Sequence, residues 1–309
     1  MARTTFDPGI TQAYTGKVSR MINPDGRFNV KRSGQRFADL GIFLYLTRLS
    51  WPAFLATLLG AFMIVNLLFA GVYFLIGVEH LSGAEVGTTW DAFMGAYFFS
   101  SQTLTTVGYG HISPKGILTS TVASIEALIG LLGFAIATGL LYTRFSKPHA
   151  QMRFSGKLLM APYREGRALM FRVANRRPNV LMEIDIKVLL MTVEGTGASA
   201  RRTYTQLTLE RESIYFLPLA WTVVHPIDES SPLHNWTAQD FAEREAEFLI
   251  LCRAFDDTFS QTVHAVQSYS ASDVVWGGRF TPTFHTDHEG AMVLEMDKIS
   301  SWDKAELPL

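Results

Sequence analysis

Two long apolar segments constrain this chain more than any other feature of its sequence. Residues 51–78 carry no charged side chain, and residues 119–145 carry only Glu126 and, near the end, Arg144. A membrane-spanning helix needs about 20 predominantly apolar residues. The sequence therefore predicts an outer transmembrane helix over residues 51–78 and an inner transmembrane helix over residues 119–145.

The charges around these segments predict their orientation. The first 50 residues contain eight Lys or Arg against three Asp, and the stretch after residue 143 is also basic. The segment between the two helices contains Glu79, Glu85 and Asp91 but only Lys115 as a Lys or Arg. Because Lys and Arg mark the cytoplasmic side, both termini are expected in the cytoplasm of a cell with this protein in its inner (plasma) membrane. The single cysteine, Cys252, agrees with a reducing compartment.

The segment between the two helices is predicted to re-enter the membrane. Residues 89–104 are too short and too mixed to span it, but Thr88 or Thr89 can cap a helix there and Asp91 suits its first turn. Such a half-helix is tolerated at membrane depth when protein surrounds it. We therefore expect a pore helix over residues 89–104, leading into a loop over residues 105–110.

This loop has the sequence expected of a potassium selectivity filter. It contains five consecutive filter residues: Thr106, Val107, Gly108, Tyr109 and Gly110. Backbone carbonyls of the first four would replace the hydration shell of K⁺, and the two glycines permit the unusual dihedral angles that such a ribbon needs. One loop cannot encircle an ion, so four copies of the chain are required. The pattern predicts a homotetramer with K⁺ as the permeant ion.

The remaining segments predict a second, all-β part. Apolar side chains alternate along residues 182–190, a turn follows at residues 195–197, and further short strands are expected at 203–209, 247–252 and 292–296. The predicted fold class is thus membrane α plus all-β, with a pore domain over residues 51–147 and a cytoplasmic β-sandwich over residues 148–309. Residues 1–35 are expected to be an extended or mobile cytoplasmic tail.

Several other readings of the sequence are disfavoured. The glycines at Gly195 and Gly197 resemble a dinucleotide fingerprint, but a β-like segment follows them, which favours a hairpin turn. The histidine and aspartate groups around His225 and His285 show no rigid scaffold for a metal site. We expect no enzyme activity, no cofactor and, at a net charge of -1, no nucleic-acid partner. A channel gated by another cytoplasmic ligand and a membrane-tethered binding module remain as alternatives.

Three further stretches resemble the bacterial inward-rectifier potassium channel (KirBac) family. Residues 37–52 look like the interfacial slide helix of that family, and residues 268–280 look like its last signature. The stretch that begins at Trp221 and contains His225, Asp228 and Ser231 is similar to the family pattern W-x-x-x-H-x-I-D-x-x-S-P-L. The resemblance implies a tetramer with an immunoglobulin-like cytoplasmic domain. Residues 36–50 are accordingly expected to form an amphipathic slide helix, although a simple extension of the outer helix is the alternative.

The same resemblance suggests roles along the inner helix. Tyr142 lies where the family has an aromatic residue at the crossing of its inner helices, so it is a candidate for a gate, and Phe134 is a second candidate. The alternative is that Tyr142 only lies at the membrane interface, as aromatic residues often do. Gly130 and Gly133 are expected at the cavity or at a hinge. Ile136 matches the position of an acid in eukaryotic relatives, so only weak rectification by Mg²⁺ or polyamine is expected.

Two sets of charged residues complete the expectations. Glu126 is predicted to be a buried acid hydrogen-bonded behind the filter, with a cation-attracting role in the cavity as the alternative. Basic and aromatic residues near the cytoplasmic leaflet are candidates for binding an anionic phospholipid or a phosphoinositide, unless they only fix the orientation of the helices. These residues are Arg48, Trp51, Arg144, Lys147, Arg153 and Lys157.

Overall fold

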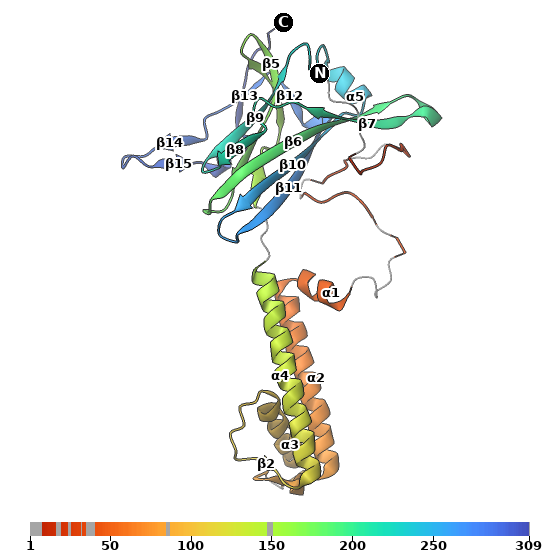
Figure 1. The fold of residues 1–309 in the computed structure, drawn as a ribbon, viewed down its shortest axis with the longest axis vertical. Helices are drawn as coiled ribbons and strands as arrows, with labels where there is room; N and C mark the ends of the chain where they lie inside the picture. The colour runs from red at the N-terminus through yellow and green to blue at the C-terminus, as the bar shows by residue number, and fades with distance from the viewer. Residues whose placement is uncertain are drawn as a thin grey trace. The chain divides into compact units, whose positions relative to one another are not determined.

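The computed structural model describes residues 8–16, 20–23, 26–31, 33–34, 41–84, 87–146 and 151–308. The side chains of Arg48 and Ala198 lie outside this description. The chain divides into two compact units, shown in Figure 1. We call residues 32–147 the membrane unit, and residues 1–31 together with residues 148–309 the sandwich unit.

The membrane unit begins with a short helix that is separate from the first long one. Two residues, Leu49 and Ser50, separate helix α1 (Ile42–Arg48) from helix α2 (Trp51–Ile76), and Pro52 lies in the first turn of α2. The chain breaks at Leu49 and Ser50, whose ψ angles of 153° and 158° are extended. Pro52 fits the first turn of α2, where the N–H that proline lacks would have no partner within the helix. Exposed apolar side chains cover α1, among them Ile42 and Phe43. Its expected start, residues 36–40, lies outside the described residues.

Helix α2 is followed by a short turn of 3₁₀ helix, η2 (Val78–His80), and by strand β1 (Leu81–Ser82). Helix α3 (Thr89–Leu104) matches the predicted pore helix at both ends. Strand β2 (Ser113–Pro114) pairs with β1, and helix α4 (Ile117–Phe145) then runs back along α2 (Figure 1). Both α2 and α4 are long and apolar enough to cross a membrane.

The described residues of the sandwich unit form two five-stranded sheets and two smaller strand pairs. In the first sheet the order is β11-β10-β6-β7, with β8 also paired to β6, and every pairing is antiparallel. Its strands are β6 (Leu181–Glu194), β7 (Arg201–Leu207), β8 (Ser213–Phe216), β10 (Glu247–Asp256) and β11 (Gln261–Ser270). The alternating segment at residues 182–190 lies within β6, and the glycine-rich turn after it, which includes η3 (Gly197–Ser199), joins β6 to β7 as a hairpin.

In the second sheet the order is β12-β4-β5-β3, with β9 paired to β5. Its strands are β3 (Met152–Phe154), β4 (Leu158–Tyr163), β5 (Gly166–Asn175), β9 (Ala220–Ile227) and β12 (Val274–Trp276). Two small pairs join β13 (Gly278–Phe280) to β16 (Trp302–Lys304) and β14 (Phe284–Thr286) to β15 (Met292–Leu294). Short helices α5 (Ala238–Glu243), η4 (Ala271–Asp273) and η5 (Met296–Ser300) complete the unit. Met296 therefore lies in η5, not in the strand expected at residues 292–296.

One hydrophobic core joins the two sheets. Alternate side chains of β6 and β10, such as Ile186 and Phe248, face side chains from the second sheet, such as Phe171 and Val223. Because one face of each sheet is buried against the other, the alternating pattern of the sequence specifies the inward face. The unit is a β-sandwich, as the alternation predicted.

The described part of the N-terminal segment packs on the first sheet of the sandwich unit. Ala13 forms a bridge with Arg201 at the free edge of β7, and the hydroxyl of Tyr204 donates a 2.8 Å hydrogen bond to the carbonyl of Thr11. Ile22 is 3% exposed and belongs to a small core with Leu249. The prediction of an extended or mobile tail did not include these contacts. The bridge to Arg201 covers part of β7, which is an edge strand of its sheet.

Candidate functional site

The pore helix begins at a two-way cap. Thr88 is the N-cap of α3: its side-chain oxygen accepts a 3.2 Å hydrogen bond from the backbone N–H of Asp91, and Asp91 Oδ2 accepts a 2.8 Å hydrogen bond from the backbone N–H of Thr88. This reciprocal arrangement satisfies two backbone donors at the helix start. It fixes where α3 begins and hence, sixteen residues later, where the filter loop leaves it.

Residues in the left-handed backbone conformation, with positive φ, alternate along the filter loop with residues of negative φ. Thr106, Gly108 and Gly110 have φ values of 57°, 52° and 83°, whereas Val107 and Tyr109 have negative φ. Glycine adopts the left-handed region without a Cβ penalty, but for Thr106 the same conformation costs energy and persists only where the surroundings impose it. Alternating handedness directs successive carbonyls to one edge of the ribbon and successive N–H groups to the other.

The ribbon is anchored to the C-terminal turn of α3. The backbone N–H of Thr106 donates to the carbonyl of Thr103 at 3.0 Å, and that of Gly108 donates to the carbonyl of Gln102 at 3.1 Å. The side chains of Val107 and Tyr109 are 54% and 78% exposed in a single chain. The loop is therefore held at its base, while one side of it remains uncovered.

Behind the pore helix, one buried carboxylate connects three helices. Glu126 on α4 has no exposed surface, and its Oε2 accepts a 2.6 Å hydrogen bond from the hydroxyl of Tyr73 on α2. Its Oε1 accepts a 2.5 Å hydrogen bond from the hydroxyl of Ser100 on α3. Ser100 also lies 3.2 Å from Oδ1 of Asn66, the one polar residue in the middle of α2. In the single chain, Glu126 thus has hydroxyl donors on both neighbouring helices and no exposed surface.

The two glycines assigned to the inner-helix cavity or hinge differ in their surroundings. A Cβ on Gly130 would lie 1.9 Å from the backbone oxygen of Leu104, the last residue of α3. Around Gly133 nothing in the chain lies within 4 Å of such a Cβ. Gly130 thus lets α4 approach the end of the pore helix closely, and α4 continues through both glycines without interruption.

Three large side chains proposed for the gate and the cavity wall project from α4. Phe134, Ile136 and Tyr142 are 75%, 65% and 72% exposed in the single chain. Apolar exposure of this extent along one helix marks a surface that lipid or another protein surface covers.

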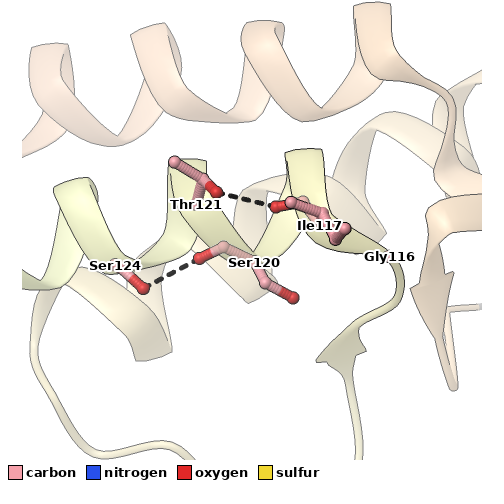
Figure 2. A pocket seen from close by; sticks show the side chains of 5 residues that line it. All are labelled: Gly116, Ile117, Ser120, Thr121 and Ser124. Carbon is pink, nitrogen blue, oxygen red and sulfur yellow. Dashed lines mark hydrogen bonds between the residues drawn. The ribbon is translucent and has the colours of Figure 1, made fainter.

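A shallow depression of about 380 Å³ lies at the start of α4. Figure 2 shows its lining, which consists of Gly116, Ile117, Ser120, Thr121 and Ser124. The hydroxyl of Thr121 donates to the carbonyl of Ile117 at 2.8 Å, and that of Ser124 donates to the carbonyl of Ser120 at 2.9 Å. The hydroxyls of Thr121 and Ser124 therefore already have partners within α4. Because the serine and glycine side chains that line the depression are small, another helix can approach α4 closely there.

Two of the residues assigned to lipid binding meet at the start of α2. The guanidinium of Arg144 donates 2.8 Å hydrogen bonds to the carbonyls of Leu46 and Leu49, and it lies 4.7 Å from the ring centre of Trp51 and 4.5 Å from that of Phe54. Arg144 therefore caps the C-terminal end of α1 and stacks on two aromatic rings. Two N–H groups of this guanidinium are therefore used for contacts inside the protein.

The other lipid candidates are placed differently. Arg153 on β3 and Lys157 belong to the sandwich unit, and Nζ of Lys157 lies 3.8 Å from a carboxylate oxygen of Asp273, which also pairs with Arg20. Lys147 and the side chain of Arg48 lie outside the described residues. Within the membrane unit, the described side chains of this set that meet are those of Trp51 and Arg144.

In the sandwich unit, the motif around His225 is a buried structural cluster. Nδ1 of His225 lies 2.6 Å from the carbonyl of Thr208, and Nε2 lies 2.8 Å from the hydroxyl of Ser231. Because a carbonyl only accepts, Nδ1 carries the proton and Nε2 accepts from Ser231. Burial lowers the pKa of His225 below its ordinary value. Nδ1 therefore ties β9 to the segment that follows β7, and Nε2 fixes the turn after β9.

Some residues around the pore helix were not predicted from the sequence. Tyr73, Ser100 and the carbonyl of Leu104 were not assigned roles, because a tyrosine or serine in an apolar helix gives no sign of its partner. The signal that was available is Glu126 itself: a buried acid requires donors on neighbouring helices.

Comparisons with known proteins agree with this architecture. Residues 152–309 match the family model described as the inward rectifier potassium channel C-terminal domain, and residues 61–147 match the model described as ion channel. The inward rectifier potassium channel Kirbac3.1 of Paramagnetospirillum magnetotacticum is 36% identical, over 90% of this chain and 94% of its own length. The chain belongs to the inward-rectifier potassium channel family.

More distant members of the family align over most of the chain as well. The G protein-activated inward rectifier potassium channel 3 of Mus musculus is 28% identical over 98% of this chain and 82% of its own length. The human channel of the same name is 28% identical over 94% of this chain and 78% of its own length. The predicted family and the predicted fold class, a two-helix pore followed by a β-rich domain, are both confirmed.

Proposed function

We propose that four copies of this chain form a potassium-selective channel of the inward-rectifier type, with K⁺ passing through the ribbon from Thr106 to Gly110. The observation that carries the proposal is the alternating left-handed backbone directly behind a capped pore helix, between two helices that can span a membrane. Four such ribbons around one axis direct four rings of carbonyls at the ion. The C-terminal end of α3 adds a negative dipole end near the cation path.

Assembly into a tetramer covers surfaces that the single chain leaves exposed. A tetramer covers the outer surface of the filter, where Val107 and Tyr109 are uncovered, and the small-residue depression at Ser120 and Ser124 leaves room for a neighbouring helix. The chain resides in the inner (plasma) membrane with both termini in the cytoplasm, in agreement with its charge distribution. The channel is passive, and it needs no cofactor and performs no enzymatic reaction.

Gating and modulation are parts of the same proposal. Rings of Tyr142 and Phe134 from four chains close the cytoplasmic end of the pore by excluding water. Anionic lipid modulates the channel through basic residues near the inner leaflet, with Arg144 acting mainly through its hold on α1. Ile136 places no acid in the cavity wall, so block by Mg²⁺ or polyamine is weak.

The test is ion flux into liposomes that contain the purified protein. Wild type should take up Rb⁺ or K⁺ selectively over Na⁺, and Gly108→Ala should abolish selective uptake because its Cβ strains the left-handed position in the filter. Gly290→Ala is the matched control: Gly290 also has positive φ, at 84°, with nothing within 4 Å of a Cβ, but it lies in the turn between β14 and β15. Selective uptake by Gly108→Ala contradicts the proposed filter.

Additional liposomes test the remaining parts. Vesicles of neutral lipid, of anionic lipid and with added phosphoinositide compare the response to lipid headgroups. Vesicles with internal Mg²⁺ measure rectification, and steep block in wild type that Ile136→Asp does not increase contradicts the expectation for Ile136.

A further inference from the structure

A cluster of four buried polar side chains joins the outer, pore and inner helices. Tyr73 and Asn66 lie on α2, Ser100 on α3 and Glu126 on α4, and each is at most 1% exposed. Glu126 forms no ion pair with a basic side chain among the residues that the structure describes. An isolated ionised carboxylate is so costly in apolar surroundings that the group binds a proton instead, unless enough donors compensate its charge. The number of donors in the cluster is therefore decisive.

The hydrogen bonds of the cluster can be counted atom by atom. The hydroxyl of Tyr73 lies 2.6 Å from Oε2 of Glu126. The hydroxyl oxygen of Ser100 lies 2.5 Å from Oε1 of Glu126 and 3.2 Å from Oδ1 of Asn66. The side-chain nitrogen of Asn66 is used elsewhere, since it donates to the carbonyl of Phe62 at 2.8 Å. Three acceptor oxygens, two of Glu126 and one of Asn66, thus share the hydrogens of two hydroxyl groups.

An ionised Glu126 leaves one of these acceptors without a hydrogen. Its two oxygens would take the hydrogens of Tyr73 and Ser100, and Oδ1 of Asn66 would remain as a buried acceptor without a donor. Such groups are costly and rare in native proteins. One additional proton removes the deficit: when Oε1 of Glu126 carries it and donates to the Ser100 oxygen, the Ser100 hydroxyl donates to Asn66. A separation of 2.5 Å suits a hydrogen bond between two oxygens in either direction.

We propose that Glu126 is a proton-binding site inside the membrane, and that its bound proton completes a chain of hydrogen bonds that runs from Tyr73 through Glu126 and Ser100 to Asn66. Compared with an ionised Glu126, the bond between Oε1 and Ser100 is reversed, with Glu126 as its donor, whereas Tyr73 still donates to Oε2. The chain leads from α2 to α4, then to α3 and back to α2. The proton is thus the ligand that connects the three helices, and the inner helix carries no fixed negative charge at this position. The inference rests on the packing of the membrane unit and does not depend on ion conduction.

Infrared spectroscopy of the full-length tetramer tests the proposal at pH 7, in a detergent that contains no carbonyl group. The carbonyl stretch of a protonated carboxyl group absorbs apart from the bands of carboxylates and backbone amides. Wild type should show this band, and Glu126→Gln should lose it. Glu247→Gln is the matched control and should keep the band, because Glu247 is also buried, at 4% exposed, but both of its oxygens accept the backbone N–H of Met21. A band that persists in Glu126→Gln belongs to another acid and overturns the proposal.

The stability of Glu126→Gln gives an independent readout. Glutamine has nearly the shape of the neutral acid: its oxygen accepts from Tyr73, and its N–H donates to Ser100 where the acid hydroxyl would. Thermal dissociation of the Glu126→Gln tetramer should therefore lie within about 4 °C of wild type, a shift that corresponds to the loss of no more than one weak interaction. A larger decrease shows that the site needs a carboxylate that only accepts, and it overturns the proposal.

A measurement on wild type alone covers the case in which Glu126→Gln does not assemble. The proposal requires at least one protonated carboxyl group in the folded tetramer at pH 7. A wild-type spectrum without the band of such a group overturns the proposal whatever the variants do.

Discussion

The hydroxyl of Tyr73 on α2 donates a 2.6 Å hydrogen bond to the carboxylate of Glu126 on α4, although 53 residues separate them in the chain. Together with the bond from Ser100, this contact places one carboxylate at the junction of the outer, pore and inner helices. A buried carboxylate is expensive unless donors surround it. The cluster is therefore a structural clamp around the pore helix.

Removing one donor should weaken this clamp. We expect Tyr73→Phe to destabilise the assembled protein by about 1–3 kcal/mol, because one oxygen of Glu126 is left without its donor. The matched control is Tyr97→Phe, since the hydroxyl of Tyr97 contacts only Sδ of Met63 at an exposed position. Thermal dissociation of the detergent-solubilised tetramer measures the loss of stability in both variants. An equal loss in the two variants contradicts the special role of Tyr73.

A methyl group at Gly130 should disturb the end of the pore helix. The Cβ of Gly130→Ala would lie 1.9 Å from the carbonyl oxygen of Leu104, so α4 must move away from α3 at a cost of about 1–3 kcal/mol. Flux should fall because the filter begins immediately after Leu104. Gly133→Ala is the control and should be neutral or slightly stabilising, since alanine favours the helix and nothing in the chain lies within 4 Å of the new methyl. Comparable flux in the two variants shows that the contact at Gly130 is unimportant.

The sequence predicted the elements whose signals are local. The uncharged residues 51–78 predicted α2, and the cap at Thr88 with Asp91 predicted the start of α3. The proline at position 52 predicted that α1 is a separate helix. Each of these signals depends on a few neighbouring residues. The alternation at residues 182–190 likewise predicted β6. Glycine at positions 108 and 110 indicated unusual backbone in the filter.

Contacts that depend on distant residues were not predictable in this way. Positive φ at Thr106 was missed, because threonine rarely adopts it and only the surroundings of the filter impose it. The packing of Ile22 against Leu249 was missed, because the polar and glycine-rich composition around Ile22 resembles a tail. The use of Arg144 as a cap for α1 was also missed, because a basic residue after a membrane helix fits the positive-inside rule equally well.

Arg144 should be irreplaceable by lysine. Its planar guanidinium reaches the carbonyls of Leu46 and Leu49 together and stacks on Trp51, whereas the single ammonium of lysine cannot do all three. We expect Arg144→Lys to speed hydrogen exchange in α1 about tenfold or more, equivalent to one charged hydrogen bond of about 1.5–3 kcal/mol.

Two comparisons make the test of Arg144 specific. Arg164→Lys alters an exposed arginine of the sandwich unit that pairs with Glu210, and it should leave exchange in α1 unchanged. The response of flux to anionic lipid is recorded in the same proteins. If Arg144→Lys leaves α1 protected but removes the lipid response, the residue binds lipid directly and the capping role is wrong.

The stability of the sandwich unit should depend on pH through His225. Burial lowers the pKa of His225 in the folded protein, so the unfolded chain binds a proton more readily than the folded one. The stabilising contribution is complete above the ordinary pKa of about 6.5 and decreases as the pH falls below it. Burial outweighs the opposing effects of the Thr208 carbonyl and the Asp228 carboxylate.

This dependence is measured as the thermal unfolding of the full-length protein between pH 5 and pH 8. As the pH decreases below about 6.5, the unfolding temperature of wild type should decrease. The unfolding temperature of His225→Gln should be lower than that of wild type but should change less with pH in this range. His264→Gln, at an exposed position on β11, should keep the wild-type slope. A wild-type slope in His225→Gln would show that other groups cause the acid sensitivity.

Tyr142 offers the most direct test of the gate. It is 72% exposed on the last turns of α4, and four copies at the crossing of the inner helices would form an aromatic ring that excludes water. We expect Tyr142→Ala to raise the open probability several-fold in single-channel recordings, because alanine leaves the ring too wide to dewet. Tyr142→Phe keeps the ring and removes only the hydroxyl, so it should behave as wild type. An unchanged open probability in an intact Tyr142→Ala tetramer assigns the residue to the lipid interface, and Phe134→Ala then becomes the variant in which the constriction is sought.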